Sequence, residues 1–479
     1  MRKGIFVSPL LAIAALILAT AASGPQVSGV GASRKGGARE WLAGDHHVHS
    51  EFSAGWQLDP AHPDAPPKPV LGGDSRHTGL QNAQMARRFG LDWIVATDHG
   101  GPRHSELNYR IAWPVIEDVR KAVPDLIVFY GLEFDTPGGE HATLIMPRDP
   151  SERENLRRIE AGYAERDAWP ADPSRDTKPR MLEALRMMEG LTPRPVLLAN
   201  HPSRTATGLG LWGLHDPQEF RRWMDAAPHV AVGMEGIPGH QAAMPENGND
   251  AAHGSRGLYG GYPTMGGFDQ MTATLGGAWD AMLSEGLHWW ITAGSDSHGH
   301  VSEGGADFWP GEYAKTWVHA QRDPADILDG LRKGRVFVST GNLVTGVSLS
   351  VAGKPVELGS TTALPANVPA VLTIEVAGAA GEPGMAADDV LDHVDVIVGS
   401  VGAAGRTDTQ VARRFSLSRA RGKSGNVTLD YRIPDFTGKI YLRLRGTNTR
   451  QGEPDVDVPG EDPRADLWFY TNPIFLARE

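Results

Sequence analysis

The chain has 479 residues, of which 40% are hydrophobic and 22% are charged, so it is long enough to build more than one compact core. Its formal net charge is −12 and it has no dense run of Lys or Arg, which argues against a nucleic-acid partner. The negative net charge is compatible with a small anionic substrate, because bound cations would dominate the local electrostatic field. The sequence has no cysteine, which excludes disulfides, thiolate ligands and cysteine nucleophiles. Any metal must therefore be bound by nitrogen and oxygen ligands.

The first residues predict export from the cytoplasm. A basic start (Arg2 and Lys3) precedes an apolar run over 9–19, which is shorter than the roughly 20 residues that a membrane-spanning helix needs. We expect a signal peptide over 1–23, a linker over 24–39, a periplasmic or secreted protein and no stable membrane span after cleavage. An uncleaved N-terminal anchor is the alternative.

Short apolar runs alternate with amphipathic segments such as 79–89 and 178–189 between residues 40 and 341. The runs that we predict as strands cover 92–97, 126–132, 196–200, 230–234 and 289–293. This alternation favours an α/β barrel or a doubly wound sheet. From residue 342 to 479 the pattern changes to stretches of alternating polarity separated by turn-rich segments, which predicts an all-β, sandwich-like domain.

Histidines and carboxylates recur where the predicted strands end, which is where function gathers in parallel-sheet and barrel enzymes. His47 and His49 lie two residues apart, so on a strand both imidazoles face the same side. The other candidates are His99, Glu133, His201, Asp296 and His298 at strand ends, and His141 in the segment after Glu133. Each alone has an ordinary explanation as a capping, core or surface residue. Together they match what a divalent cation needs, neutral imidazoles and carboxylates that converge from separate strands.

These residues, in this order, resemble the PHP (polymerase and histidinol phosphatase) family of metallohydrolases. The matching motifs are H-x-H (His47, His49), T-D-H (Thr97–His99), a strand-end Glu followed by His (Glu133, His141), H-P (His201, Pro202) and S-D-S-H (Asp296, His298). Within that family the chain looks most like the carbaryl-hydrolase-like branch, in 323–341 and 468–476. The amidohydrolase family also opens with H-x-H, but it generally uses a carboxylated Lys as bridging ligand and ends in a lone Asp.

The resemblance implies a distorted, seven-stranded β/α barrel of TIM-like type over 40–341 that holds two or three Zn, Mn or Fe ions at its C-terminal face. His47, His49, Glu133 and Asp296 would hold the first ion. Glu133 would bridge to a second ion, completed by His141 and His201. His99 and His298 would serve a third.

The sequence departs from the family pattern shortly after H-x-H. The family usually places an Asp or His there as a ligand of the third ion, whereas this chain has Ser53-Ala54-Gly55. We consider Asp59, His62 or His77 as substitutes, or else a weak or empty third site. His46 faces the opposite side of its strand and is expected to be structural, and His240 is a loop residue within possible reach of the pocket.

The function implied by the resemblance is metal-dependent hydrolysis in which a metal-bridging hydroxide attacks the substrate. Asp98 would orient a ligand histidine, and Arg204 would bind an anionic group, with a surface ion pair as its equal alternative. We favour a phosphoesterase that acts on a small, anionic molecule. Hydrolysis of carboxyl esters or carbamates at the same metals is the first alternative, and a non-catalytic binding protein is the second.

Overall fold

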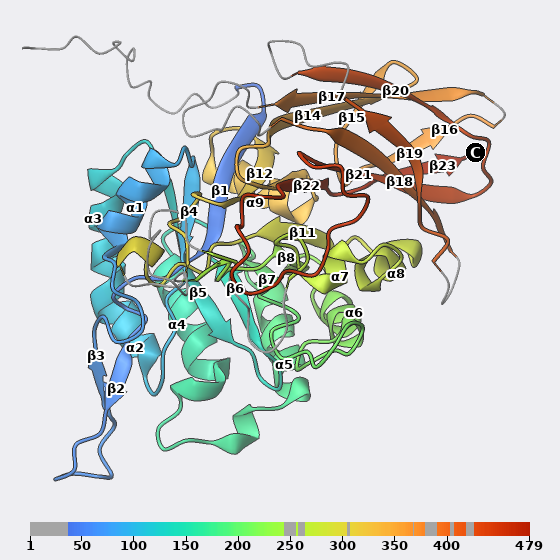
Figure 1. Ribbon diagram of the computed structural model, residues 1–479. Helices are drawn as coiled ribbons and strands as arrows, with labels where there is room; N and C mark the ends of the chain where they lie inside the picture. The colour runs from blue at the N-terminus through green and yellow to red at the C-terminus, as the bar shows by residue number, and fades with distance from the viewer. Residues whose placement is uncertain are drawn as a thin grey trace, which may run out of the picture. The chain divides into compact units, whose positions relative to one another are not determined.

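The computed structural model describes residues 37–243, 255–256, 264–303, 307–366, 368–378, 390–402, 407–417 and 426–479 (Figure 1). The predicted signal peptide over 1–23 and most of the predicted linker lie outside these residues. Among the described helices, none is long and apolar enough to cross a membrane.

The described helices all precede residue 333. They are α1 (Gly79–Arg88), α2 (His104–Leu107), α3 (Trp113–Ala122), α4 (Glu152–Tyr163), α5 (Lys178–Glu189), α6 (Pro217–Ala226), α7 (Gln270–Ala273), α8 (Ala278–Ser284) and α9 (Pro324–Arg332), with a π-helical turn over Asn108–Ala112 and 3-10 turns over Glu165–Asp167, Pro173–Arg175 and Val301–Glu303. Several begin at a Thr or Asp whose side chain accepts hydrogen bonds from the first turn, among them Thr78 before α1 and Asp323 before α9. The amphipathic segments predicted over 79–89 and 178–189 are confirmed as α1 and α5.

A large mixed sheet runs through the described chain. Its strands are β1 (Glu40–Val48), β4 (Trp93–Ala96), β5 (Ile127–Asp135), β6 (His141–Ile145), β7 (Val196–Ala199), β8 (Ala231–Ile237), β11 (Trp290–Ala293), β12 (Ala314–Ala320), β13 (Val336–Thr340), β16 (Thr361–Leu364), β18 (His393–Val401), β19 (Gln410–Ser416), β21 (Lys439–Thr447), β22 (Trp468–Thr471) and β23 (Ile474–Arg478). The smaller sheets contain β14 (Val344–Val351), β15 (Lys354–Val356), β17 (Ala370–Gly378) and β20 (Val427–Ile433), the hairpin β2 (Gly55–Gln57) and β3 (Lys68–Val70), and the pair β9 (Ala242–Ala243) and β10 (Ser255–Arg256).

The strands of the first 300 residues follow the order β11-β8-β7-β6-β5-β4-β1. β1, β4 and β5 are parallel, as are β7, β8 and β11, whereas β6 runs antiparallel to both of its neighbours. The segment after β11 bonds back to the end of β1, because Asp296 N donates to His47 O at 2.9 Å and His49 N donates to Ser297 O at 3.1 Å. The ends of the first and last strands in this row therefore lie side by side.

Burial on both faces explains why these strands are nearly continuous apolar runs. Every residue of β7, β8 and β11 is buried, as is β5 after its first residue. Six tryptophans are among the largest fully buried side chains, which places much of the core beside these strands: Trp93, Trp223, Trp279, Trp289, Trp290 and Trp468. All five strands predicted in this region are confirmed.

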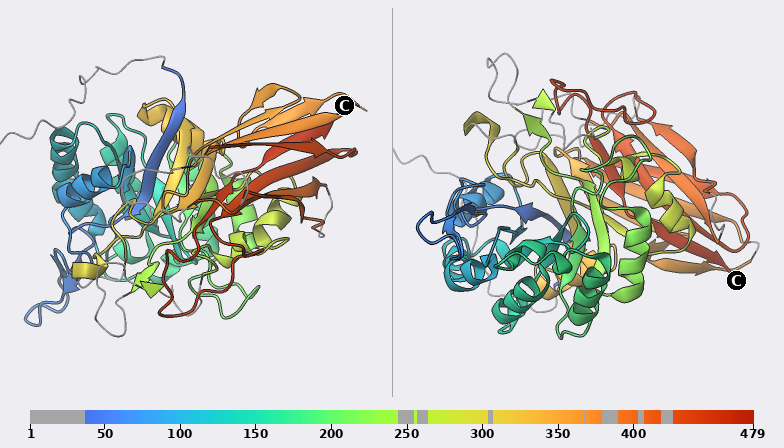
Figure 2. Two further views of the ribbon diagram at one scale, coloured as in Figure 1. Left: turned by 45° about the horizontal axis from the view of Figure 1, so that its top comes forward. Right: turned by 90° about the horizontal axis from the view of Figure 1, so that it is seen from below.

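The C-terminal region is rich in strands, as predicted. β14, β17 and β20 pair antiparallel, and β21 pairs with β18, β22 and β23. The large sheet continues across the predicted domain boundary at 341/342, since β13 pairs with β22. In Figure 2 the yellow strands of the 314–340 segment lie between the blue β1 and the red C-terminal strands. The prediction of a mixed α/β chain with a β-rich C-terminal region is confirmed, and the exact domain boundary stays a prediction.

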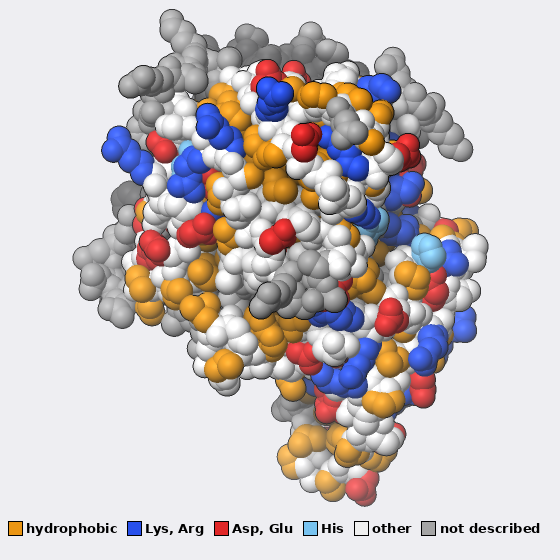
Figure 3. Space-filling view, turned by 90° about the vertical axis from the view of Figure 1, so that its right-hand side faces the viewer, with side chains coloured by type: hydrophobic (Ala, Val, Ile, Leu, Met, Phe, Trp, Pro, Cys, Tyr) orange, Lys and Arg blue, Asp and Glu red, His pale blue; other side chains and the backbone are white. Residues whose placement is uncertain are grey.

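A buried ion pair joins the two regions. Asp280 of α8 receives a two-pronged contact from Arg443 of β21, at 2.9 Å from Nε and 2.8 Å from Nη2, and both side chains are buried. On the face seen in Figure 3, basic and acidic side chains are interspersed around apolar areas. Because both side chains of the ion pair are shielded from solvent, removing one partner leaves the other charge without compensation.

We therefore predict that Asp280→Ala lowers the free energy of unfolding by about 3–5 kcal/mol, measured by urea denaturation. Asp118→Ala is the control, because Asp118 pairs with Lys121 at 2.9 Å on an exposed helix face. The control should keep the wild-type midpoint. Equal midpoints for the two variants would contradict the role assigned to Asp280.

Candidate metal centre

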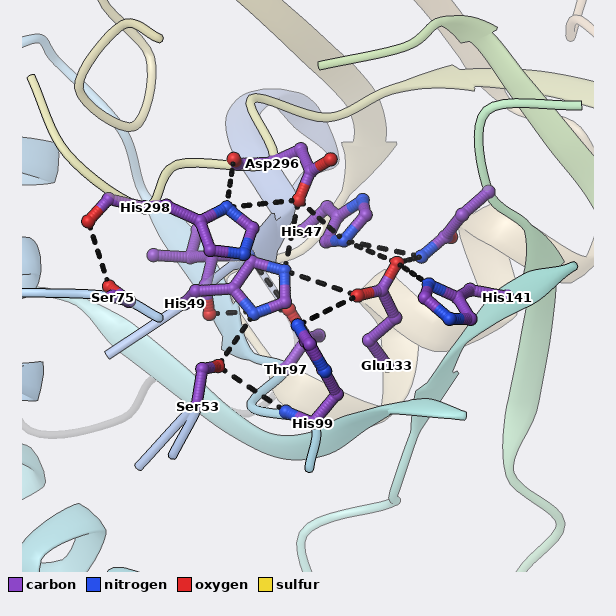
Figure 4. A network of polar contacts seen from close by, with 12 residues as sticks. His47, His49, Ser53, Ser75, Thr97, His99, Glu133, His141, Asp296 and His298 are labelled. Atoms are coloured by element: carbon purple, nitrogen blue, oxygen red, sulfur yellow. Dashed lines mark hydrogen bonds and ion pairs between the residues drawn. The ribbon is translucent and has the colours of Figure 1, made fainter. Parts of the chain in front are cut away.

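Histidines and carboxylates from the ends of β1, β4, β5, β7 and β11 and from the start of β6 converge on one buried point, shown in Figure 4. The innermost group, here the inner cluster, contains His47, His49, Glu133 and Asp296, all buried. His47 Nε2 lies 3.1 Å from Glu133 Oε1 and 3.2 Å from Asp296 Oδ1. His49 Nε2 lies 3.0 Å from Asp296 Oδ1 and 3.4 Å from Glu133 Oε2. Two imidazoles and two carboxylates thus face one another within ligand range of a single cation.

Glu133 also belongs to a second group, the middle cluster, together with His141 and His201. Its Oε1 lies 3.0 Å from both His141 Nδ1 and His201 Nε2. The backbone explains the convergence, because Glu133 is near the end of β5, His141 begins the antiparallel β6 and His201 follows β7. One carboxylate therefore stands between two groups of histidines.

A third group, the outer cluster, consists of His49, His99 and His298. The rings of His49 and His298 stack with their centroids 3.9 Å apart, and His99 lies edge-on to His49 at 5.0 Å. The side chains of His99 and His298 are 14% and 17% exposed, compared with 0% for His49. Two of its three imidazoles are therefore partly open to solvent, unlike the fully buried His49.

All eight residues predicted as metal ligands are thus brought together. Buried clusters of His, Glu and Asp that could hold metal ions are present, as the sequence predicted. The buried atoms His49 Nε2 and His141 Nδ1 each face a carboxylate oxygen at 3.0 Å, an arrangement suited to ligands that share a cation.

The buried carboxylates and imidazoles of the centre shift one another's pKa values. Although burial opposes ionisation, the imidazoles of His141 and His47 keep the pKa of Glu133 well below its usual value. Burial lowers the pKa of His201 to about 3, so this imidazole is neutral. Burial also lowers the pKa of His141, but Glu133 outweighs it and raises this pKa to about 10. The buried carboxylates thus attract positive charge to the centre, and metal binding would release the protons that otherwise supply it.

Glu235, near the end of β8, supports the ligands from behind and was not predicted. Its Oε1 lies 2.8 Å from His47 Nδ1, and its Oε2 accepts a hydrogen bond from His201 N at 2.6 Å. Both contacts orient ligand histidines, as carboxylates commonly do behind metal sites. The signal was in the sequence, since Glu235 directly follows the strand predicted over 230–234.

Asp98 acts on a ligand histidine through an intermediary. It accepts hydrogen bonds from Ser50 Oγ at 2.7 Å and from Ser53 Oγ at 2.9 Å, and Ser53 Oγ lies 2.8 Å from His49 Nδ1. Asp98 is therefore linked to a candidate ligand histidine through Ser53. Asp98 holds the loop that orients His49.

Backbone strain accumulates at the centre. His201, His240 and Asp296 have φ angles of 30°, 56° and 50°, in the left-handed region that residues with a Cβ seldom adopt. Packing around Asp296 is also close, because a Cβ added at Gly239 would lie 2.0 Å from Asp296 Cβ. These unusual backbone conformations occur where the candidate ligands project into the centre.

A cavity of about 390 Å³ opens onto the clusters. Its lining includes Arg76, Arg166, Arg204 and His240, next to the ligands Glu133, His141, Asp296 and His298. Arg166 is held by Asp135, with its Nε 2.8 Å from Oδ1. The predicted Arg204 is 41% exposed and lies 3.9 Å from Glu140, so it is placed to meet a substrate and also neighbours an acid.

None of the three residues considered as substitutes for the missing ligand after H-x-H joins the centre. Asp59 and His62 contact each other at 3.2 Å, and the ring of His77 packs on Trp309 at 4.1 Å. That expectation is wrong, because the loop instead brings Asp74 Oδ2 to 3.0 Å from His99 Nε2. His46 is buried with its Nδ1 3.3 Å from Thr143 Oγ1, consistent with the structural role expected for it.

His240 reaches the centre, as the sequence analysis allowed. Its Nε2 lies 3.1 Å from Asp296 Oδ2, on the side of that carboxylate opposite the inner cluster.

A comparison with models of protein families found no match, and a comparison with curated proteins found none either.

We predict that Glu235→Ala weakens the affinity for divalent cations by about 10- to 100-fold, because His47 and His201 lose the carboxylate that orients them. Isothermal titration with Mn²⁺ measures the effect. Glu160→Gln is the control, since Glu160 is also a buried carboxylate beside a histidine, His104, but lies outside the clusters. An affinity loss in Glu160→Gln equal to that in Glu235→Ala would contradict the prediction.

Proposed function

We propose that the protein is a metal-dependent hydrolase of the PHP type that cleaves phosphoesters. The observation that carries this proposal is the position of Glu133. Its Oε1 faces His47, His141 and His201 at 3.0–3.1 Å, and its Oε2 faces His49 and His99 at 3.4 and 3.8 Å. Glu133 thus faces both imidazoles of the inner cluster and both imidazoles of the middle cluster, which suits a carboxylate that bridges two cations.

The strand arrangement supports the family proposal. The row β1, β4, β5, β6, β7, β8 and β11 returns on itself through the bonds of Asp296 and Ser297 to the end of β1. We propose that these strands form the distorted seven-stranded barrel that the resemblance implies. Clustering of the candidate ligands at one end of the strands is the arrangement expected of barrel enzymes.

The donor set fits two or three ions of Zn, Mn or Fe, because it consists of imidazole nitrogens and carboxylate oxygens without thiolates. Such ions would supply Lewis acidity and would favour ionisation of water near neutral pH. Glu133 and Asp296 provide the negative charge that retains cations. Glu235 and Ser53 fix the imidazole planes of His47 and His49, so that the ligand atoms are preorganised.

The lining of the cavity supports an anionic substrate. Arg166 has its Nη2 3.5 Å from His99 Nδ1 and 3.4 Å from His141 Nε2, so its guanidinium lies beside the outer and middle clusters. Arg76 and Arg204 line the same cavity. Guanidinium groups bind phosphate oxygens in a two-pronged geometry, which favours a phosphoester over the neutral group of a carboxyl ester or carbamate.

Completeness of the ligand set argues against a non-catalytic binding protein, since all eight predicted ligands are present and face one another.

We propose a periplasmic or secreted location on the basis of residues 1–23 alone, which lie outside the described residues.

Replacing Glu133 tests the bridging role. We predict that Glu133→Gln lowers kcat by about 10³-fold or more while the circular dichroism spectrum stays unchanged, because the amide cannot bridge cations as a carboxylate does. The control is Glu152→Gln, which alters another buried carboxylate, paired with Arg120 away from the centre. Wild-type kcat in Glu133→Gln would refute the bridging role.

The substrate class is tested with p-nitrophenyl phosphate, bis-p-nitrophenyl phosphate and 1-naphthyl acetate on the metal-loaded protein. We expect turnover of a phosphoester to exceed that of the acetate. We also predict that Arg166→Ala raises KM for the phosphoester about 10- to 100-fold but leaves KM for the acetate unchanged, because only the former has anionic oxygens.

Arg110→Ala is the matched control, since Arg110 pairs with Glu106 on the surface. Preferred hydrolysis of the acetate, with KM independent of Arg166, would support the ester or carbamate alternative instead.

A further inference from the structure

The outer cluster contains three imidazoles and no carboxylate, and the position shortly after H-x-H where a carboxylate ligand was expected is Ala54. We propose that Asp74 is the carboxylate ligand of a cation bound by His99 and His298, brought there by the hairpin of β2 and β3. This inference rests on the proposed metal-dependent function, and it assigns to the chain a ligand that sequence spacing does not reveal.

The side-chain geometry places Asp74 opposite both imidazoles. Its Oδ2 lies 3.0 Å from His99 Nε2 and 3.5 Å from His298 Nε2. The other ring nitrogen of His298, Nδ1, is engaged 2.8 Å from the backbone oxygen of Asp296. The nitrogen of His298 that faces Asp74 is therefore the one available to a cation.

The backbone explains how a distant residue reaches this point. The hairpin leaves the core after Ala54 and returns so closely that Asp74 N donates to Ser53 O at 3.2 Å. This return requires glycine, because a Cβ added at Gly73 would lie 2.3 Å from Gly55 N. Asp74 thus lies in space beside the residue where the missing ligand was expected, although 20 positions separate it from Ala54.

The opposite side of the loop is fixed to the segment that carries His298. Arg76 N donates to His298 O at 3.1 Å, and Ser75 Oγ donates to the same oxygen at 3.0 Å. Figure 4 shows Ser75 next to His298, at the edge of the ligand group. Asp74 is therefore held between two segments, each of which carries or adjoins a ligand histidine.

The solvent exposure of Asp74 predicts the order in which the cations bind and leave. The side chain of Asp74 is 48% exposed, whereas those of Glu133 and Asp296 are 3% exposed. A cation held by Asp74 is consequently the most accessible to solvent and to chelators. We expect it to bind last and to leave first.

The first experiment counts ions. Wild-type protein, Asp74→Asn and the control Asp64→Asn are loaded with Mn²⁺, and the bound metal is measured by elemental analysis and isothermal titration. Asp64 is an exposed acid of the same hairpin. Asp74→Asn should lose about one ion per chain or bind its last ion more than about 100-fold more weakly, whereas Asp64→Asn should match the wild type.

The second experiment detects ligation directly and does not depend on activity. Because the sequence has no cysteine, Asp74→Cys introduces the only thiol, and Asp64→Cys is its matched control. With Co²⁺, a thiolate ligand gives a charge-transfer absorption band in the near ultraviolet, which we expect for Asp74→Cys alone.

The outcomes separate this inference from the function on which it rests. An unchanged ion count and affinity in Asp74→Asn, together with no charge-transfer band in Asp74→Cys, would overturn the role of Asp74 while leaving the inner and middle clusters intact. A wild-type protein that binds no divalent cation would overturn the proposed function itself.

Discussion

The structure depends on the burial of two carboxylates, Glu133 and Asp296, in contact with the same imidazoles. Asp296 Oδ1 and the two oxygens of Glu133 all lie within 3.0–3.4 Å of His47 Nε2 or His49 Nε2, at a point that solvent scarcely reaches. Negative charges buried so close together are costly unless positive charge lies between them. Protons on the histidines or divalent cations can supply that charge, and the convergence of imidazole and carboxylate atoms suits cations.

Several features of the fold serve to keep these ligands in place. Glu235 holds His47 from one side, and Asp98 holds His49 through Ser53. Asp296 has a left-handed backbone, and its chain segment bonds to β1 directly beside the two histidines of H-x-H. The antiparallel β6 returns His141 to the carboxylate at the end of β5. Each of these contacts brings together residues that are far apart in the sequence. The buried core offsets the free-energy cost of the backbone strain.

Much of this arrangement was predictable from sequence because the relevant signals are local. Apolar runs locate the strands, and a histidine or acid after a run marks a candidate ligand, as for Glu133, His201 and Asp296. Residues whose position depends on long-range packing were not predictable. Asp74 follows no strand of the large sheet and reaches the centre only because its hairpin closes on Gly55. The continuation of the sheet from β13 to β22 likewise joins residues more than a hundred positions apart. Glu235 was missed although its signal was local.

A crystal structure of the protein purified without added metal, with anomalous diffraction data, would show whether Glu133 and Asp296 hold divalent cations. We expect one anomalous peak between Glu133 and Asp296, within bonding distance of His47 and His49. We expect a second peak between Glu133, His141 and His201, so that the Glu133 carboxylate contacts both cations. Density in which Glu133 bonds only to protonated histidines, with no anomalous peak even after soaking in Mn²⁺ or Zn²⁺, would contradict the assignment of a metal centre.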